Sequence, residues 1–162
     1  MHTGVPGQIS IAADGLRVGI AASRFHGEIV ERLIGGAREA LAEYGLPGSA
    51  IGLERVPGAW ELPFALDRMA ATGRWDGLLA LGTLIRGETS HYEVIAHVSA
   101  GAIAEVSRQR QVPISFGVLT CETIDQAMAR SGGSAGNLGA DAARAVLEMA
   151  ALARRLKSGQ DA

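Results

Sequence analysis

A segment near the middle of the chain combines residue types that bind small anions and transfer protons. GTLIRGETSH, residues 82–91, places Gly87, Glu88, Thr89 and Ser90 between an apolar run and a long helical pattern. The start of a helix has free backbone N–H groups and a partial positive charge, and both favour a bound phosphate. The hydroxyl groups could instead only cap the helix, and the sequence leaves both interpretations open.

His91 directly follows these residues and is a candidate proton-transfer group. An imidazole titrates near neutral pH, so it can both donate and accept protons at the mouth of a pocket. A single histidine can equally be an ordinary surface residue. Ser90 and Glu93 form a capping-box pattern at the start of the predicted helix, although Thr89 could cap it equally well.

Two other loops supply aromatic rings and a carboxylate. Phe25 and His26 follow one predicted strand, and Trp60 and Glu61 follow another. An uncharged planar ligand could stack on these rings. The alternatives are that Phe25 acts as a hydrophobic staple and that Trp60 packs in the first turn of its helix.

Arg130 is our candidate for a cationic phosphate ligand. Its planar guanidinium suits phosphate oxygens, and the glycine-rich segment 132–139 follows closely. Arg130 could instead only stabilise the end of a short helix. The chain has neither a GxGxxG pattern nor the lysine of a P-loop, and no spacing of His, Cys and carboxylates suggests a metal site.

Composition excludes several classes of protein. The 162 residues include 15 basic and 17 acidic side chains, a formal charge of -2 that predicts neither a nucleic acid nor a membrane surface as partner. Lys157, the only lysine, lies in the polar tail LKSGQDA, which excludes an enzyme that forms an imine through its own buried lysine. The single cysteine, Cys121, forms no intrachain disulfide and predicts a cytoplasmic protein. The apolar run 78–85 is far shorter than the ~20 residues of a membrane span, and the N-terminus lacks the pattern of a secretory signal.

Apolar runs alternate with helical patterns along the chain. We expect strands at 16–23, 51–58, 77–85 and 112–120, and helices at 24–45, 60–73, 86–111, 122–132 and 139–157. Crossover connections of this kind predict an α/β fold, a three-layer αβα sandwich with a four-stranded parallel sheet in flavodoxin-like order. We expect one domain at 16–157, a flexible arm at 1–15 and a tail at 158–162. Ligands of such sheets bind beyond the C-terminal strand ends, where the loops described above converge.

Three motifs in order, VPGAWELP, GTLIRGETSHYE and FGVLTCETIDQAMARSGGSAGNLGADAA, resemble the 6,7-dimethyl-8-ribityllumazine synthase family from about Leu16 to Leu156. The resemblance implies a transferase of riboflavin biosynthesis with the same fold. It would condense 5-amino-6-(D-ribitylamino)uracil with 3,4-dihydroxy-2-butanone 4-phosphate to give 6,7-dimethyl-8-ribityllumazine, releasing phosphate and water. The substrate's own amine would form the imine, and neither a metal nor an organic cofactor is implied.

The resemblance also implies roles for individual residues. Those matching the binding site for the ribitylaminouracil are Phe25, Ala59, Trp60, Glu61, Thr83, Leu84, Ile85 and Phe116. Those matching the seat of the butanone phosphate are Glu88, Thr89 and Arg130. His91 matches the proton-transfer histidine, and the neighbouring subunit would supply Phe116 and Arg130.

Each site would therefore lie between two chains of a homo-oligomer. The resemblance implies a pentameric ring, with a decamer or an icosahedral shell as larger alternatives and riboflavin synthase as a candidate partner. Many members carry lysine at one of the places that read Ser134 and Leu138 here, and Glu93 stands where aspartate is usual. These departures leave open a non-catalytic paralogue that binds flavin or lumazine or only forms a shell. A flavodoxin-like electron carrier ranks lower, because its loops should be more acidic and aromatic.

Overall fold

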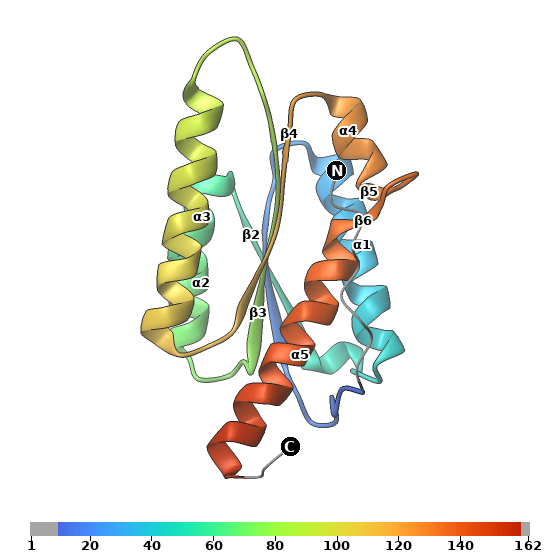
Figure 1. The fold of residues 1–162 in the computed structure, drawn as a ribbon, viewed down its shortest axis with the longest axis vertical. Helices are drawn as coiled ribbons and strands as arrows, with labels where there is room; N and C mark the ends of the chain where they lie inside the picture. Colours follow the sequence, from blue (N-terminus) through green and yellow to red (C-terminus); the bar gives the residue numbers. More distant parts are fainter. Residues whose placement is uncertain (1–9, 160–162) are drawn as a thin grey trace.

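The computed structural model describes residues 10–159 and confirms the alternation of strands and helices (Figure 1). In chain order the elements are β1 (Val18–Ser23), α1 (Gly27–Glu43), η1 (Gly48–Ala50), β2 (Ile51–Val56), η2 (Ala59–Glu61), α2 (Leu62–Ala71), β3 (Gly77–Ile85), α3 (His91–Arg110), β4 (Ile114–Cys121), α4 (Ile124–Ala129), β5 (Ser131–Gly133), β6 (Gly136–Asn137) and α5 (Leu138–Ser158). Residues 1–9 of the predicted arm and 160–162 of the predicted tail lie outside the described residues.

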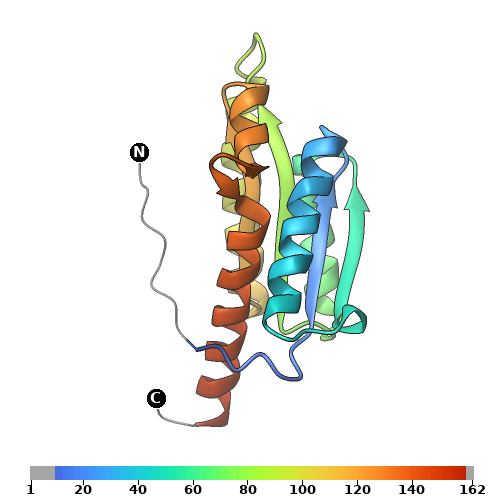
Figure 2. The ribbon, with the colours of Figure 1, turned by 90° about the vertical axis from the view of Figure 1, so that its right-hand side faces the viewer.

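The main sheet has the strand order β2-β1-β3-β4, and all of its neighbouring strands are parallel. Helices α2 and α3 cover one face and α1 and α5 cover the other, as Figure 1 shows. Figure 2, turned by 90°, places α1 and α5 in front of the sheet. The predicted three-layer αβα sandwich in flavodoxin-like order is therefore confirmed.

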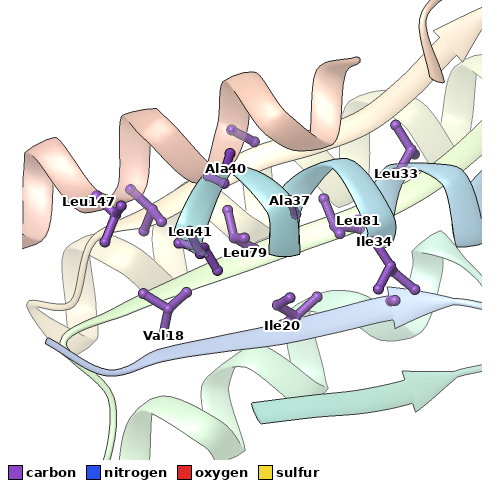
Figure 3. Packing of buried hydrophobic residues seen from close by; sticks show 14 of the residues in the cluster. Val18, Ile20, Leu33, Ile34, Ala37, Ala40, Leu41, Leu79, Leu81 and Leu147 are labelled. Carbon is purple, nitrogen blue, oxygen red and sulfur yellow. The ribbon is translucent and has the colours of Figure 1, made fainter. Parts of the chain in front are cut away.

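The larger part of the core lies between the sheet and the α1/α5 layer. The buried side chains of α1 form one apolar stripe, because residues three and four apart share one face of a helix. Figure 3 shows Val18 and Ile20 of β1 and Leu79 and Leu81 of β3 pointing towards this helix. Burial of each such leucine contributes about 1.5 to 3 kcal/mol of hydrophobic stabilisation.

Two glycines set the position of the helices in this layer. Gly45 has φ +85° and ends α1, as its sequence position predicted. Gly139, in the first turn of α5, lies against the backbone of α1, where an added Cβ would stand 2.1 Å from the carbonyl oxygen of Leu33. Only glycine allows the two helices to approach this closely.

The structure corrects two local predictions. The helix predicted at 86–111 begins only at His91. Of the two capping residues left open, Ser90 makes no side-chain cap, whereas Thr89 Oγ1 accepts the His91 N–H at 3.3 Å. The glycine-rich segment 132–139, where we expected no strand, takes part in the antiparallel pair β5 and β6. Strands of three and two residues are too short to produce a detectable period in the sequence.

Candidate active site

A cavity of about 710 Å³ opens at the carboxyl ends of β1, β2 and β3. The predicted site residues that line it are Phe25, Ala59, Trp60, Glu61, Thr83, Leu84, Ile85, Thr89 and His91. They come from three loops that are distant in the sequence. The rule that ligands bind beyond the ends of parallel strands therefore located the cavity correctly.

The loop between β1 and α1 presents an aromatic ring to this cavity. Phe25 is 67% exposed, and its ring lies beside Gly58, where an added Cβ would stand 3.2 Å from it. His26 has the left-handed conformation, with φ 54° and ψ 51°, and its carbonyl accepts the Ile29 and Val30 N–H groups that begin α1. This conformation is uncommon outside glycine, and histidine is one of the few side chains enriched in it. The turn thus holds Phe25 outside the core.

The loop between β2 and α2 is held by a carboxylate. Glu61 Oε2 accepts the Gly58 N–H at 2.8 Å, which fixes the short turn η2. Trp60, 54% exposed, lines the cavity from the same turn. The Arg24 N–H donates to the carbonyls of Val56 and Pro57 at 3.0 and 3.2 Å and so joins this loop to the one carrying Phe25.

Strand β3 extends beyond its neighbour β1 and leaves backbone groups free at the cavity. The pairing of β1 with β3 ends at Ala22 and Leu81, whereas the pairing of β3 with β4 continues to Ile85 and Cys121. Backbone groups of successive residues point to opposite sides of a strand, so the segment 83–85 directs part of its N–H and C=O groups away from β4. These groups suit the edge of a planar ligand that both donates and accepts hydrogen bonds.

The loop between β3 and α3 offers donors for an anion. Within residues 10–159, the backbone N–H groups of Gly87, Glu88 and Thr89 donate to no protein acceptor. Gly87 and Thr89 line the cavity, whereas Glu88 is exposed and is not among the lining residues. The helix dipole of α3 adds partial positive charge at the same place. The geometry agrees with a phosphate seat formed by backbone groups.

His91 stands at the first position of α3 and is exposed to solvent. Its ring makes no hydrogen bond to the described residues, so both of its nitrogens are available to a ligand. The neighbouring carboxylate of Glu93 instead pairs with Arg86, with Oε1 2.9 Å from Nη1. The hydrogen bonds that the Arg86 guanidinium donates to the carboxylates of Glu93 and then Glu122 raise its pKa above its usual range.

Phe116 and Arg130 do not line the cavity of their own chain. Phe116 pairs with Ala80 in the sheet and is exposed on edge strand β4. Arg130 is an exposed residue at the end of α4, and its carbonyl accepts the Leu138 N–H at 2.9 Å. Nearby, burial raises the pKa of the Cys121 thiol, and the charge of Arg130 partly opposes this rise.

Sequence reasoning missed the contribution of α3 beyond His91. Tyr92, Val94 and Ile95 also line the cavity. Val94 and Ile95 stand three and four residues after His91, which places them on its face of the helix. That spacing was visible in the sequence. Within residues 10–159, no group of three or more His, Cys, Asp or Glu side chains is placed to hold a metal ion, and none of the helices is long and apolar enough to cross a membrane.

The fold and the cavity define a class of protein, a flavodoxin-like α/β protein with an apolar, aromatic pocket beside a helix start suited to an anion. Residues 15–154 match the family model described as 6,7-dimethyl-8-ribityllumazine synthase. The protein of that name from Desulfovibrio desulfuricans is 43% identical over 144 residues, covering 89% of this chain and 91% of the relative. Its namesake from Halorhodospira halophila is 44% identical over 148 residues, covering 91% and 95%. The chain belongs to the 6,7-dimethyl-8-ribityllumazine synthase family.

Proposed function

We propose that this chain condenses 5-amino-6-(D-ribitylamino)uracil with 3,4-dihydroxy-2-butanone 4-phosphate to form 6,7-dimethyl-8-ribityllumazine, a step of riboflavin biosynthesis. Family membership supports the reaction. The observation that carries it in the structure is the cavity, which brings Phe25 and Trp60 together with the helix start at Thr89 and with His91. One end of the cavity suits a planar ring, and the other suits a phosphate.

The ribitylaminouracil binds at the aromatic end. Its ring stacks on Phe25, and its polar edge bonds the free backbone groups of 83–85. The ribityl chain extends along η2. There the Glu61 carboxylate keeps lone pairs for a hydroxyl group in addition to its bond with Gly58.

The butanone phosphate binds at the α3 end. Backbone N–H groups around Glu88 and Thr89 receive its phosphate, and Arg130 from an adjacent copy closes the seat. The substrate amine attacks the ketone, and the resulting carbinolamine loses water to form the imine. Phosphate then leaves with its oxygens stabilised by these donors, and tautomerisation and ring closure with loss of a second water give the product.

His91 moves protons during these steps. His91 lines the same cavity as Phe25 and Thr89, and its ring nitrogens make no hydrogen bond to the described residues. Such acid–base help contributes on the order of 10² to 10⁴ in rate, and holding two substrates together contributes the larger share. The roles of all these side chains are part of the proposal.

We infer a homo-oligomer, a ring of five chains, because two proposed site residues stand outside the chain's own cavity. Support comes from large apolar side chains exposed around η2, α2, α3 and β4, namely Trp60, Phe64, Val94, Val98 and Phe116. Such a surface is typical of an interface between copies. We extend this proposal to larger assemblies, either stacked rings or a shell. It also includes contact with riboflavin synthase and a cytoplasmic location. Light scattering under native conditions that finds only a monomer would contradict the shared site.

The activity is tested by mixing the protein with both substrates and following lumazine fluorescence against a protein-free control. We expect product above background and a fall in kcat on the order of 10² or more for His91→Ala. His97→Ala is the matched control, since His97 lies on the same helix and bonds the Glu93 carbonyl at 2.8 Å. Binding of a lumazine or flavin without any turnover would instead favour the non-catalytic paralogue.

A further inference from the structure

Arg86 joins three elements at the end of the sheet. It follows β3 directly, and its backbone N–H donates to the carbonyl of Cys121 at the end of β4, at 2.9 Å. Its guanidinium Nη1 lies 2.9 Å from Glu93 in the first turn of α3, and Nε lies 2.6 Å from Glu122 after β4. The guanidinium also lies over the ring of Tyr92, 4.8 Å from its centroid.

These contacts surround the loop that carries the proposed phosphate seat. Residues 87–90 leave the sheet at Arg86 and enter α3 at His91, so the two ends of the loop meet at this side chain. Tyr92 lines the cavity, whereas Arg86 is not among the lining residues. Arg86 therefore contacts Tyr92, which lines the cavity, without lining the cavity itself.

We propose, on the basis of the proposed function, that Arg86 is a positioning residue for the phosphate seat. It holds the β3–α3 loop and the first turn of α3 against the end of β4. The N–H donors of the loop and His91 are then in place before the phosphate substrate arrives. Without this anchor, each binding event would have to order the loop, and the entropic cost of that ordering would weaken affinity for the phosphate substrate.

Arg86 has a second connection, towards the segment that ends at Arg130. Glu122, its partner after β4, donates its backbone N–H to Gln126 Oε1 in α4 at 2.9 Å. Arg130, which we assign to an adjacent site, is the capping residue after the end of α4. The same clamp thus links the loop of one site to the helix that serves the next.

A direct role of Arg86 as phosphate ligand is the competing account. One positive charge on Arg86 against two negative charges, on Glu93 and Glu122, leaves the triad at a net charge of -1, which does not attract an anion. The two accounts predict opposite effects for Glu122→Gln. If Arg86 is a clamp, loss of this carboxylate loosens the loop and weakens phosphate binding. If Arg86 binds phosphate directly, the same loss frees its guanidinium and strengthens phosphate binding.

The test compares Arg86→Ala, Arg86→Lys and Glu122→Gln with the control Arg108→Ala, which breaks the ion pair with Glu105 farther along α3. We expect KM for the butanone phosphate to rise about tenfold in Arg86→Ala and at least about threefold in Glu122→Gln, with kcat within about threefold of wild type. The KM of Arg86→Lys for the butanone phosphate should lie between those of Arg86→Ala and wild type, because an ammonium group cannot bridge two carboxylates as the planar guanidinium does. KM for the ribitylaminouracil should stay within about twofold.

Hydrogen exchange of the unliganded protein supplies a readout independent of activity. The clamp predicts faster exchange at 87–93 in Arg86→Ala and Glu122→Gln, with the strands and the Arg108→Ala protein unchanged. Unchanged exchange at 87–93, or a lower KM in Glu122→Gln, would overturn the proposal. A wild-type protein that forms no lumazine would overturn the proposed function, while the exchange comparison would still decide whether Arg86 acts as a clamp.

Discussion

The long helices on the two faces of the sheet, α1 and α5 on one and α3 on the other, are buried to very different extents. Both α1 and α5 bury a continuous apolar stripe against the sheet and against each other. Helix α3 is almost as long as α5, yet it buries only Ser99 and Ile103 and leaves Val94 and Val98 exposed. The α1/α5 face completes a core within one chain. Helix α2 also buries its apolar side chains against the sheet, so the open surface on this side belongs mainly to α3. The cavity lies beside the first turn of α3, in the part of the molecule to which we assign function.

Truncation of Leu147 in α5 should produce the largest loss of stability. This side chain is fully buried, and Leu147→Ala should lower the free energy of unfolding by about 3 kcal/mol through lost burial and an unfilled cavity. Met149→Ala on the same helix is the control, because Met149 is 46% exposed and should cost less than about 1 kcal/mol. Urea unfolding measures both. Equal losses of unfolding free energy in the two variants would contradict the conclusion that α5 stabilises the protein through its buried face.

A charge on α3 should affect assembly more than folding. Val98→Glu places a carboxylate in the exposed apolar surface and should weaken association by about 2 kcal/mol or more if that surface is covered by another chain. Sedimentation at several concentrations should show smaller particles, whereas circular dichroism should remain that of the wild type. Full-size assemblies at every concentration would show that this part of α3 is not an interface.

Arg130→Ala should chiefly raise KM for the butanone phosphate, by about tenfold, because one charged phosphate donor is lost. Arg144→Ala is a matched control, since its guanidinium pairs with Glu43 and Asp141 on the α1/α5 face. Steady-state kinetics with each substrate varied in turn separates the two KM values. An unaltered KM in Arg130→Ala would remove Arg130 from the phosphate seat.

The smallest expected effect concerns the contact between α2 and α3. Hydrogen bonds from Arg110 and then from Arg68 lower the pKa of Asp67 from 3.8 to about 2. A carboxyl whose pKa is lower in the folded state stabilises the protein above its unfolded pKa, and this contribution is lost as the pH falls from about 4 to about 2. Asp67→Asn should cost less than about 1 kcal/mol at pH 7, because the ion pairs are partly exposed.

Unfolding free energies of Asp67→Asn and wild type, measured between pH 7 and pH 2, should therefore converge at the acid end. Asp125→Asn is the control, since Asp125 forms no ion pair among residues 10–159. A constant difference across the whole range would mean that Asp67 acts through packing alone.

The sequence predicted the sheet well, because its strands are apolar and its helices have a clear period. It predicted the cavity because strand ends could be located without knowledge of side-chain contacts. It did not predict the β5/β6 ribbon, whose strands are too short, and it left open whether Ser90 or Thr89 caps the start of α3, where the structure shows Thr89. Ser90 has the pattern of a cap, but only the backbone geometry decides which hydroxyl reaches the free N–H.

The sequence could not predict the ion pair between Arg86 and Glu122 either. Glu122 is distant from Arg86 in the chain and becomes a neighbour only because β3 and β4 end side by side. Phe116 and Arg130 present a different case. Neither residue lines the chain's own cavity, and their place in an adjacent site is a prediction that rests on the resemblance.

The most direct test of a site shared between copies uses two defective chains together. His91→Ala removes a group from a chain's own cavity, and Arg130→Ala removes a group supplied to its neighbour. In rings that mix both chains equally, about a quarter of the sites regain both residues. We predict that co-expressed chains show lumazine synthesis at low butanone phosphate well above the average of the two separate variants. Activity no higher than that average, in particles shown to contain both chains, would contradict the account.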